Sequence, residues 1–418
     1  MRAFSIPRAA FFALTLLSAS TGFAAEPNSA MDFNGATPLQ WSERMADSQV
    51  ARLDGRLAWK AGGKGGKWDY TAGLFTLSLL KLNEQIPNPS HVAFVTNVIG
   101  SFISNDGQIA DYHPAEFQLD AINPGKTVIA LYLLTKEERY AKAAALLEKQ
   151  FFTQPRTFDG GFWHKERYTN QMWLDGLYMG DPFYAEYTKV FHGPATNFDD
   201  VAHQFALVKE HLYDAKTGLY YHGWDAAKVQ AWANPKTGTS SNFWGRAVGW
   251  YAMALVDTLD FLPANHPARK EMTGQINDLA RGIVKYQDAD TGVWWQVMDK
   301  GNAKGNYREA TGSTMFVYAL AKAVNDGELP KSYAPAILKG YRGLLKEFVR
   351  TNDSGGLTLI QCCQVAGLGF KSTRGGPRDG SFEYYVSEPI VENDNKGVGP
   401  FILAGIEVQK LVNTMRKN

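Results

Sequence analysis

An aspartate in apolar, aromatic surroundings is the first candidate for chemistry in this sequence. Asp175 lies between Leu174 and Gly176 within NQMWLDGLYMGDPFYAEY, with Trp173 and Tyr178 close by. Apolar surroundings raise the pKa of a carboxyl group, because burial disfavours its charged form. Such a group can serve as a general acid, and it can equally be a buried structural acid held by hydrogen bonds.

A second aspartate, Asp120, occurs in FQLDAINPGK, just before the proline that is expected to start a helix. Two carboxyl groups on separate loops of one cleft are the usual requirement of glycoside hydrolysis. Asp120 could instead cap the following helix, because an aspartate side chain accepts hydrogen bonds from free backbone N–H groups there. The two acids therefore indicate glycoside chemistry, with structural roles as the alternative for each.

A third cluster combines a cation with aromatic rings. In NFWGRAVGWY, Trp250 follows Arg246 by four residues, so a helix would place both on one face, and Trp244 is close by. A guanidinium group binds a carboxylate through two parallel hydrogen bonds, which suits an acidic sugar. Packing of an arginine on tryptophan at a helix start is the alternative. His222, at the end of a repeated loop, is a further candidate, and a plain polar loop residue is its alternative.

Other chemistries lack their motifs. No HExxH, CxxC or run of acids at metal-ligand spacing occurs, so we predict neither a metal nor another cofactor. Motifs of serine hydrolases and of phosphate-binding and dinucleotide-binding loops are also missing. Lys and Arg number 43 and Asp and Glu 42, without a basic stripe, which argues against a nucleic-acid partner. The adjacent Cys362 and Cys363 are interpreted as reduced and buried.

Helices must position these residues, because apolar residues recur at intervals of three and four. The pattern predicts helices over 70–82, 126–150, 199–213, 244–262, 275–286, 314–324 and 333–349. Loops rich in glycine and aromatic residues recur between helices, most clearly at 213–222 and 287–296. About six such units would fill the chain and close into an all-α (α/α)6 barrel, a six-hairpin toroid. We expect the loops to gather at one end, with Trp163, His222 and Trp294 facing the same side.

The N-terminus is typical of an export signal. Arg2 and Arg8 both precede an apolar run over residues 9–19, and small residues follow this run. The run is too short to span a bilayer. We therefore expect residues 1–24 to be a signal peptide and residues 25–418 to form a single domain. Once the signal is removed, we expect the mature protein to be soluble, without a membrane partner, and to be periplasmic or secreted.

Several stretches together resemble glycoside hydrolase family 105, the unsaturated rhamnogalacturonyl hydrolases, which is related to the unsaturated glucuronyl hydrolases of family 88. They are the segment around Asp175, WDYTAGL, LDAINPGK, GGFWHK, HGWD, FWGRAVGWY and RDGSFEYYVSEPIVENDNKGVGPFILAGIE. The resemblance covers most of the chain. It implies an (α/α)6 barrel with Asp175 as general acid and base and Asp120 as its essential companion. It also implies a cleft lined by Tyr70, Lys165, Trp173, His222, Trp244, Arg246 and Trp250.

The resemblance further implies a reaction on oligosaccharides left by polysaccharide lyases, which end in a 4,5-unsaturated uronic acid. In that family the acid protonates C4, water adds at C5, and the hemiketal opens to release the neighbouring sugar. The expected partner is therefore a rhamnogalacturonan or pectin oligosaccharide that ends in unsaturated galacturonic acid. The alternatives are glycosaminoglycan-type unsaturated disaccharides, intact glycosides cleaved by an inverting pair of aspartates, and an exported oligosaccharide-binding protein without catalysis.

Overall fold

The structure is a computed structural model that describes Met1, residues 33–371 and residues 375–417. The chain divides into two units, Met1–Asp32 and Phe33–Asn418. Apart from Met1, the predicted signal peptide (1–24) lies outside the described residues. Within the described residues, no helix is long and apolar enough to cross a membrane.

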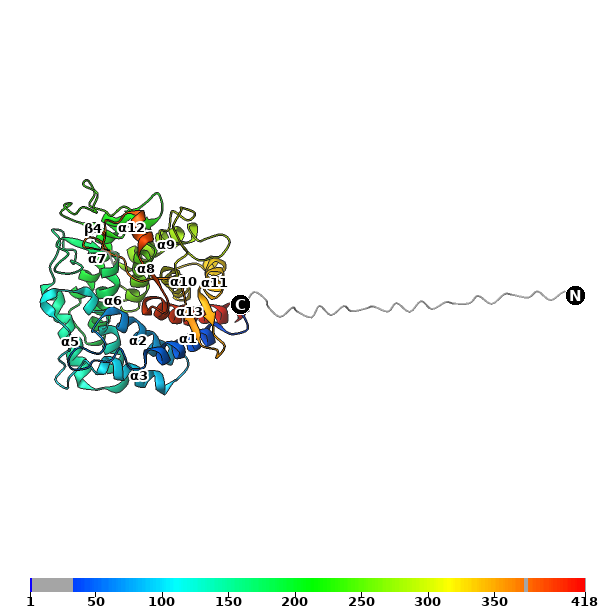
Figure 1. Ribbon diagram of the computed structural model, residues 1–418, viewed down its shortest axis with the longest axis horizontal. Coiled ribbons are helices and arrows are strands. Elements are labelled where there is room, and N and C mark those ends of the chain that lie inside the picture. The colour runs from blue at the N-terminus through cyan, green and yellow to red at the C-terminus, as the bar shows by residue number, and fades with distance from the viewer. Residues whose placement is uncertain (2–32, 372–374, 418) are drawn as a thin grey trace. The chain divides into compact units, whose positions relative to one another are not determined.

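Six helices of the second unit form a closed inner ring (Figure 1). They are α2 (Tyr70–Asn83), α4 (Gly125–Thr135), α6 (Leu174–Val190), α8 (Gly245–Leu259), α10 (Ala310–Asn325) and α13 (Asn395–Lys417). Each contacts the next in this order, and α13 contacts α2 to close the ring. A helix that is buried all round belongs in the centre of a protein, and every residue of α8 except Asp257 is buried.

Six further helices cover the inner ring. They are α1 (Pro38–Leu53), α3 (Pro89–Gly100), α5 (Glu138–Thr153), α7 (Thr196–Leu212), α9 (Arg269–Lys285) and α11 (Ala334–Gly343). Each packs on an inner helix: α1 on α13, α3 on α2, α5 on α4, α7 on α6, α9 on α8 and α11 on α10. The alternation of outer and inner helices confirms the predicted all-α (α/α)6 barrel.

The described strands are short and lie in connections that lead from an outer helix to the next inner helix. β1 (Gln171–Trp173) pairs with β4 (Gly223–Asp225), with Met172 opposite Trp224. The other antiparallel pairs are β2 (Tyr213–Asp214) with β3 (Leu219–Tyr220), β5 (Val349–Thr351) with β6 (Leu357–Leu359), and β7 (Cys362–Cys363) with β8 (Ile390–Val391). Short helical turns also occur outside the two layers: η2 (Pro114–Glu116), η3 (Leu119–Ala121), η4 (Lys331–Tyr333), η5 (Leu344–Phe348) and α12 (Phe382–Ser387).

Hydrogen bonds hold neighbouring connections together where the inner helices begin. Leu174, Gly245 and Ala310, the first residues of α6, α8 and α10, each donate a backbone hydrogen bond to the next connection along the chain. The glycine-aromatic loops of these units therefore gather at one end of the ring, as expected. Trp294 differs from the expectation: its Nε1 donates to the carbonyl of Ile283, and its ring packs on Phe316 among the helices.

Two local expectations are wrong. The helix expected over 126–150 is two helices, because Lys136 adopts a left-handed φ of 60° and turns the chain from inner helix α4 to outer helix α5. Asp175, expected on a loop, lies in the first turn of α6. Cys362 and Cys363 are both buried and free, as predicted.

Candidate active site

Asp175 faces an imidazole ring at the start of α6. Its side chain is only 12% exposed, and Oδ2 lies 3.1 Å from Nε2 of His222. The two atoms are not aligned as a hydrogen bond, and both are buried without a hydrogen-bond partner among the residues that the structure describes. On the other side of the ring, Nδ1 is 2.8 Å from the hydroxyl oxygen of Tyr385, a phenol whose pKa burial raises well above its ordinary value. Asp175 and His222 thus keep hydrogen-bonding capacity for a ligand.

Asp120, the second aspartate, forms an ion pair with a lysine. It lies on η3, where its carboxylate accepts a hydrogen bond from Nζ of Lys165 and lies 3.4 Å from Nε2 of His164. Burial acts to raise the pKa of Asp120, but the charges of Lys165 and His164 outweigh burial and hold the pKa below its ordinary value. The capping alternative is wrong, because the first turn of α4 has no side-chain cap.

His164 lies between the two aspartates, and the sequence did not single it out as a site residue. Burial lowers its pKa to about 4, although Asp120 and Asp175 both act to raise it. The ring is therefore neutral near neutral pH, and it stacks on Trp173 with 4.9 Å between ring centroids. Its Nδ1 is buried without a hydrogen bond among the described residues. His164 directly precedes Lys165 in the segment GGFWHK, and this position could have indicated it as a site residue.

Aromatic rings connect the histidine to the predicted carboxylate-binding arginine. The ring of His222 lies 5.3 Å from that of Trp173 and 4.8 Å from that of Trp244. The guanidinium carbon of Arg246 lies 4.7 Å from the centroid of Trp244. Arg246 donates one hydrogen bond from Nη1 to the carbonyl of Cys363, and its buried Nε has no partner among the described residues. The Arg246 side chain is therefore held in place by the carbonyl of Cys363, and its Nε remains able to donate a hydrogen bond to a ligand.

Tyr70 and Trp250 complete the set of predicted residues. Tyr70 begins α2, and its ring meets that of Trp250 edge-on at 6.0 Å. Burial raises the pKa of Tyr70 well above its ordinary value; Asp120 raises it further and Arg246 opposes the rise. Tyr70 is thus close enough to Asp120 and Arg246 for both charges to act on it. The structure therefore places all nine predicted site residues at the N-terminal ends of inner helices or in the adjoining connections.

Gln296 is a positioning residue at this end of the ring, and the repeated loop indicated it. It holds the same place in its loop as His222 does in the other copy. Its side-chain oxygen accepts from Nε1 of Trp244 at 3.2 Å, and its amide nitrogen donates to the backbone oxygen of Tyr385 at 3.0 Å. Gln296 therefore fixes two residues that touch His222.

This arrangement suits acid–base chemistry on an anionic sugar. Asp175 and Asp120 supply two carboxyl groups in different electrostatic surroundings, and Lys165 and Arg246 supply cations that can meet a substrate carboxylate. The described residues include no group of three or more His, Cys, Asp or Glu side chains placed to hold a metal ion.

Comparisons with known proteins agree with this fold. The sequence model of Glycosyl Hydrolase Family 88 matches residues 41–412. A solved glycoside hydrolase from family 105 of C. acetobutylicum ATCC 824 is 43% identical with a TM-score of 0.83, covering 88% of this chain and 99% of that chain. These matches, together with a helical barrel that has two carboxyl groups at one end, show that the chain is a glycoside hydrolase.

Two proteins of similar sequence also match parts of this chain. The 24.9 kDa protein in the picA locus of Rhizobium radiobacter is 40% identical over 233 residues, which cover 55% of this chain and 97% of the relative. The unsaturated rhamnogalacturonyl hydrolase YesR of Bacillus subtilis is 26% identical over 286 residues, which cover 67% of this chain and 77% of the relative. The chain belongs to glycosyl hydrolase family 88, together with its relatives of family 105.

Replacing Arg246 by lysine is expected to weaken transition-state binding by about 1–3 kcal/mol, because lysine keeps the charge but loses the two-pronged hydrogen bond. Steady-state kcat/KM measures this loss. Arg44→Lys is a matched control, since Arg44 also stacks on a tryptophan (4.5 Å from Trp41) and donates to a carbonyl, but lies on outer helix α1. Equal kcat/KM for Arg246→Lys and the wild type would show that Arg246 does not bind the substrate carboxylate.

Replacing Lys165 by methionine is expected to shift the acid limb of the pH–rate profile to higher pH. The lysine charge lowers the pKa of Asp120, whereas burial, which remains in the variant, raises it. If ionised Asp120 is required, activity falls as the pH drops through this pKa, so a higher pKa moves the fall upward. Lys209→Met, which breaks a lysine–aspartate pair with Asp278 elsewhere, is the control. An acid limb that does not move in Lys165→Met would show that ionisation of Asp120 does not control activity at low pH.

Proposed function

We propose that the protein removes 4,5-unsaturated galacturonic acid from the non-reducing end of rhamnogalacturonan or pectin oligosaccharides left by lyases. The observation that carries this proposal is the meeting of Asp175, Asp120, Lys165 and Arg246 at one end of a family 88 barrel. The name of YesR, an unsaturated rhamnogalacturonyl hydrolase, supports this substrate class. The two cations match the carboxylate of the unsaturated sugar.

In the proposed reaction, Asp175 acts first as an acid and then as a base. Its carboxyl group gives a proton to C4 of the enol ether, which develops positive charge at C5 and the ring oxygen. Water adds at C5 and returns a proton to the carboxylate, so one water molecule is consumed. The hemiketal at C5 then opens, and the bond to the neighbouring sugar breaks. His222, whose Nε2 lies 3.1 Å from Asp175, orients this carboxyl group.

Asp120 has a different task in this proposal. Its lowered pKa keeps it ionised, so it holds Lys165 in place and presents a negative charge near the positive charge that develops on the sugar. His164 stays neutral beside it and can donate or accept a hydrogen bond to the substrate. The neutral imidazole therefore adds no cation that would oppose the transition state.

Loss of ultraviolet absorbance by the unsaturated uronate tests the proposed substrate. We expect fast loss with unsaturated galacturonyl-rhamnose and at least tenfold lower kcat/KM with an unsaturated glycosaminoglycan disaccharide of the same length, a difference of about 1.4 kcal/mol. Preference for the glycosaminoglycan product would move the assignment to the unsaturated glucuronyl hydrolases. Binding of either sugar without turnover would favour an oligosaccharide-binding protein.

We also propose that residues 1–24 direct export to the periplasm or the medium. The charged start at Arg2 and Arg8 and the apolar run over 9–19 support this proposal. Sequencing the N-terminus of the protein recovered from the periplasm or medium should give a chain that begins at Ala25.

A further inference from the structure

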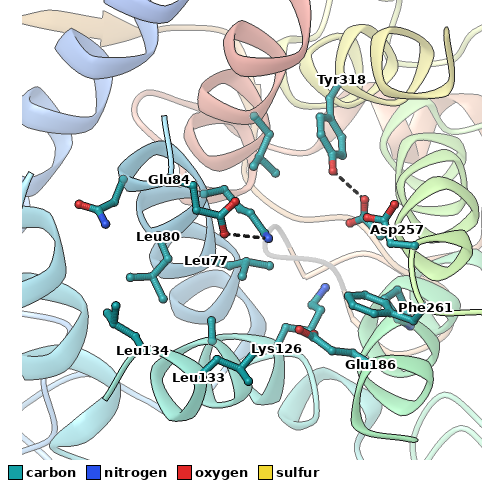
Figure 2. A pocket seen from close by; sticks show the side chains of 16 residues that line it. Leu77, Leu80, Glu84, Lys126, Leu133, Leu134, Glu186, Asp257, Phe261 and Tyr318 are labelled. Carbon is teal, nitrogen blue, oxygen red and sulfur yellow. Dashed lines mark hydrogen bonds and ion pairs between the residues drawn. The ribbon is translucent and has the colours of Figure 1, made fainter. Parts of the chain in front are cut away.

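A cavity lies among the inner helices, lined by residues other than those of the candidate active site (Figure 2). Its volume is about 330 Å³, which is within the range of small-molecule sites. Leu80 and Lys81 of α2, Leu133 and Leu134 of α4, and Asp257 of α8 all come from the last turns of their helices. The candidate active site, by contrast, is built where the inner helices begin.

One side of this cavity is apolar and opens to solvent. Leu77, Leu80 and Leu403 are buried in its wall, and Phe261 borders it. Leu133 and Leu134 are 45% and 52% exposed, although they adjoin this apolar wall. Two neighbouring exposed leucines beside an apolar cavity are suited to cover the apolar part of a ligand.

The polar side of the cavity has two carboxyl groups that lack a cationic partner. Glu186 forms no hydrogen bond or ion pair with a described residue, and Asp257 accepts a hydrogen bond from the hydroxyl of Tyr318 at 2.6 Å. The other two acids lining the cavity are already paired: Glu84 with Lys81, and Asp260 with Lys322.

Lys126 is the one cation lining the cavity that has no ion pair among the described residues. Its Nζ lies 3.5 Å from the centroid of the Tyr178 ring and donates to the carbonyl of that residue at 3.4 Å. It therefore interacts with the neighbouring tyrosine, and neither Glu186 nor Asp257 forms an ion pair with it. The two unpaired carboxyl groups outnumber this single unpaired cation.

Burial makes both unpaired carboxyl groups costly to ionise, and it also lowers the pKa of the neighbouring Lys126 to about 8. Burial raises the pKa of Glu186 to about 8, even though Lys81 and Lys126 act to lower it and Asp257 and Asp260 act to raise it. Burial raises the pKa of Asp257 to about 6; Lys322, Lys126 and the hydroxyl of Tyr318 oppose the rise, and Asp260 adds to it. A cation placed between the two carboxyl groups would stabilise their ionised forms.

We propose that this cavity binds an amphipathic organic cation, with its ammonium group at Glu186 and Asp257 and its aliphatic chain along Leu80, Leu133 and Leu134. Phe261 and Tyr318 add aromatic rings beside the cation. A bare metal ion does not suit the site, because the described residues provide no group of three or more metal-binding side chains. A carboxylate-bearing ligand would place its charge next to two unpaired acids.

Isothermal titration calorimetry with three probes of equal chain length tests this proposal on the whole protein. We expect hexylammonium to bind about tenfold more tightly than hexan-1-ol, and hexanoate to bind more weakly than both, which corresponds to about 1.4 kcal/mol for the charge. Affinity for hexylammonium should increase as the pH rises through about 6 to about 8, with release of protons from Asp257 and Glu186. Equal affinities for the three probes, or no binding of any, would overturn the proposal.

Variants separate recognition of charge from loss of the cavity. Glu186→Gln should weaken hexylammonium binding about tenfold and leave hexan-1-ol unchanged. Glu138→Gln, at an exposed position on α5 that does not line the cavity, should change neither. Ala130→Phe should fill the cavity and abolish binding of all probes, with folding checked by circular dichroism. Hexylammonium affinity that is unchanged in Glu186→Gln, or that survives Ala130→Phe, would contradict the site.

The same titration on Asp175→Asn distinguishes this cavity from the candidate active site. Because the two sites share no described lining residue, hexylammonium should bind this variant as it binds the wild type. If the affinity falls with Asp175→Asn, the probe occupies the active site and the proposal is wrong. The outcome does not depend on which sugar the enzyme hydrolyses.

Discussion

Asp175→Asn is expected to lower kcat on an unsaturated substrate by about 10²–10⁴-fold, because the amide has the shape of the carboxyl group but cannot deliver its proton. Folding should be nearly unchanged, since the amide has the same shape and Oδ2 of Asp175 makes no hydrogen bond with a described residue that the replacement would break. The same protein sample provides both measurements: loss of ultraviolet absorbance for the rate and thermal denaturation for stability.

Asp181→Asn is the matched control for this prediction. Asp181 lies on the same helix, is 1% exposed, and has a pKa that burial raises well above its ordinary value. Burial favours the neutral form of this carboxyl group, so the amide should change neither rate nor stability strongly. An Asp175→Asn enzyme of near-normal rate, or equal losses in both variants, would contradict the assignment of Asp175 as the acid.

Asp120→Asn is expected to reduce both activity and stability. The replacement leaves the charge of Lys165, whose side chain is 12% exposed, without its carboxylate partner, and breaking a buried pair in this way costs about 3–5 kcal/mol. A group whose pKa is lowered on folding stabilises the fold above its unfolded pKa, and this contribution disappears as the pH falls through the folded pKa. Urea denaturation at neutral and acid pH should therefore show the largest difference from wild type at neutral pH.

A double-mutant cycle separates the structural part of this effect from the catalytic part. Asp120→Asn combined with Lys165→Met removes both partners, so it should recover most of the lost free energy of unfolding. Activity should stay at least 10²-fold below wild type, because the ionised carboxylate beside the sugar is still missing. Recovery of activity in the double variant would mean that Asp120 serves only to neutralise Lys165.

The fold could be predicted from the sequence where helices alternate between a buried and an exposed side. The outer helix α9 was predicted from this periodicity over 275–286, though it begins earlier, at Arg269. The inner helix α6 was missed although the equally buried α8 was predicted, because Gly176, Gly180 and Pro182 inside α6 are typical of turns and helix breaks. The turn at Lys136, where α4 gives way to α5, was hidden because the apolar Leu133 and Leu134 precede it and no glycine or proline marks it, although both leucines are exposed.

The candidate site could be predicted where its residues belong to distinctive local segments, as with Asp120, Asp175 and Arg246. The groups that hold His222 and Arg246 in place could not, because contacts across the ring have no local pattern. Tyr385, which meets Nδ1 of His222, is separated from it by 163 positions. The carbonyl of Cys363, which anchors Arg246, is a backbone group that no side-chain motif identifies.

The position of deuterium in the product tests the proposed hydration most directly. Hydrolysis in heavy water should place one solvent deuteron at C4 of the released uronic acid product, because the exchangeable carboxyl group of Asp175 protonates that carbon. Nuclear magnetic resonance of product from the first turnovers detects this deuteron, and unlabelled product kept in the same heavy water measures the exchange that the neighbouring C5 ketone allows at C4. A product labelled at C4 in a single configuration is the predicted result; a product without deuterium there, or labelled equally in both configurations, would contradict protonation of C4 by the enzyme.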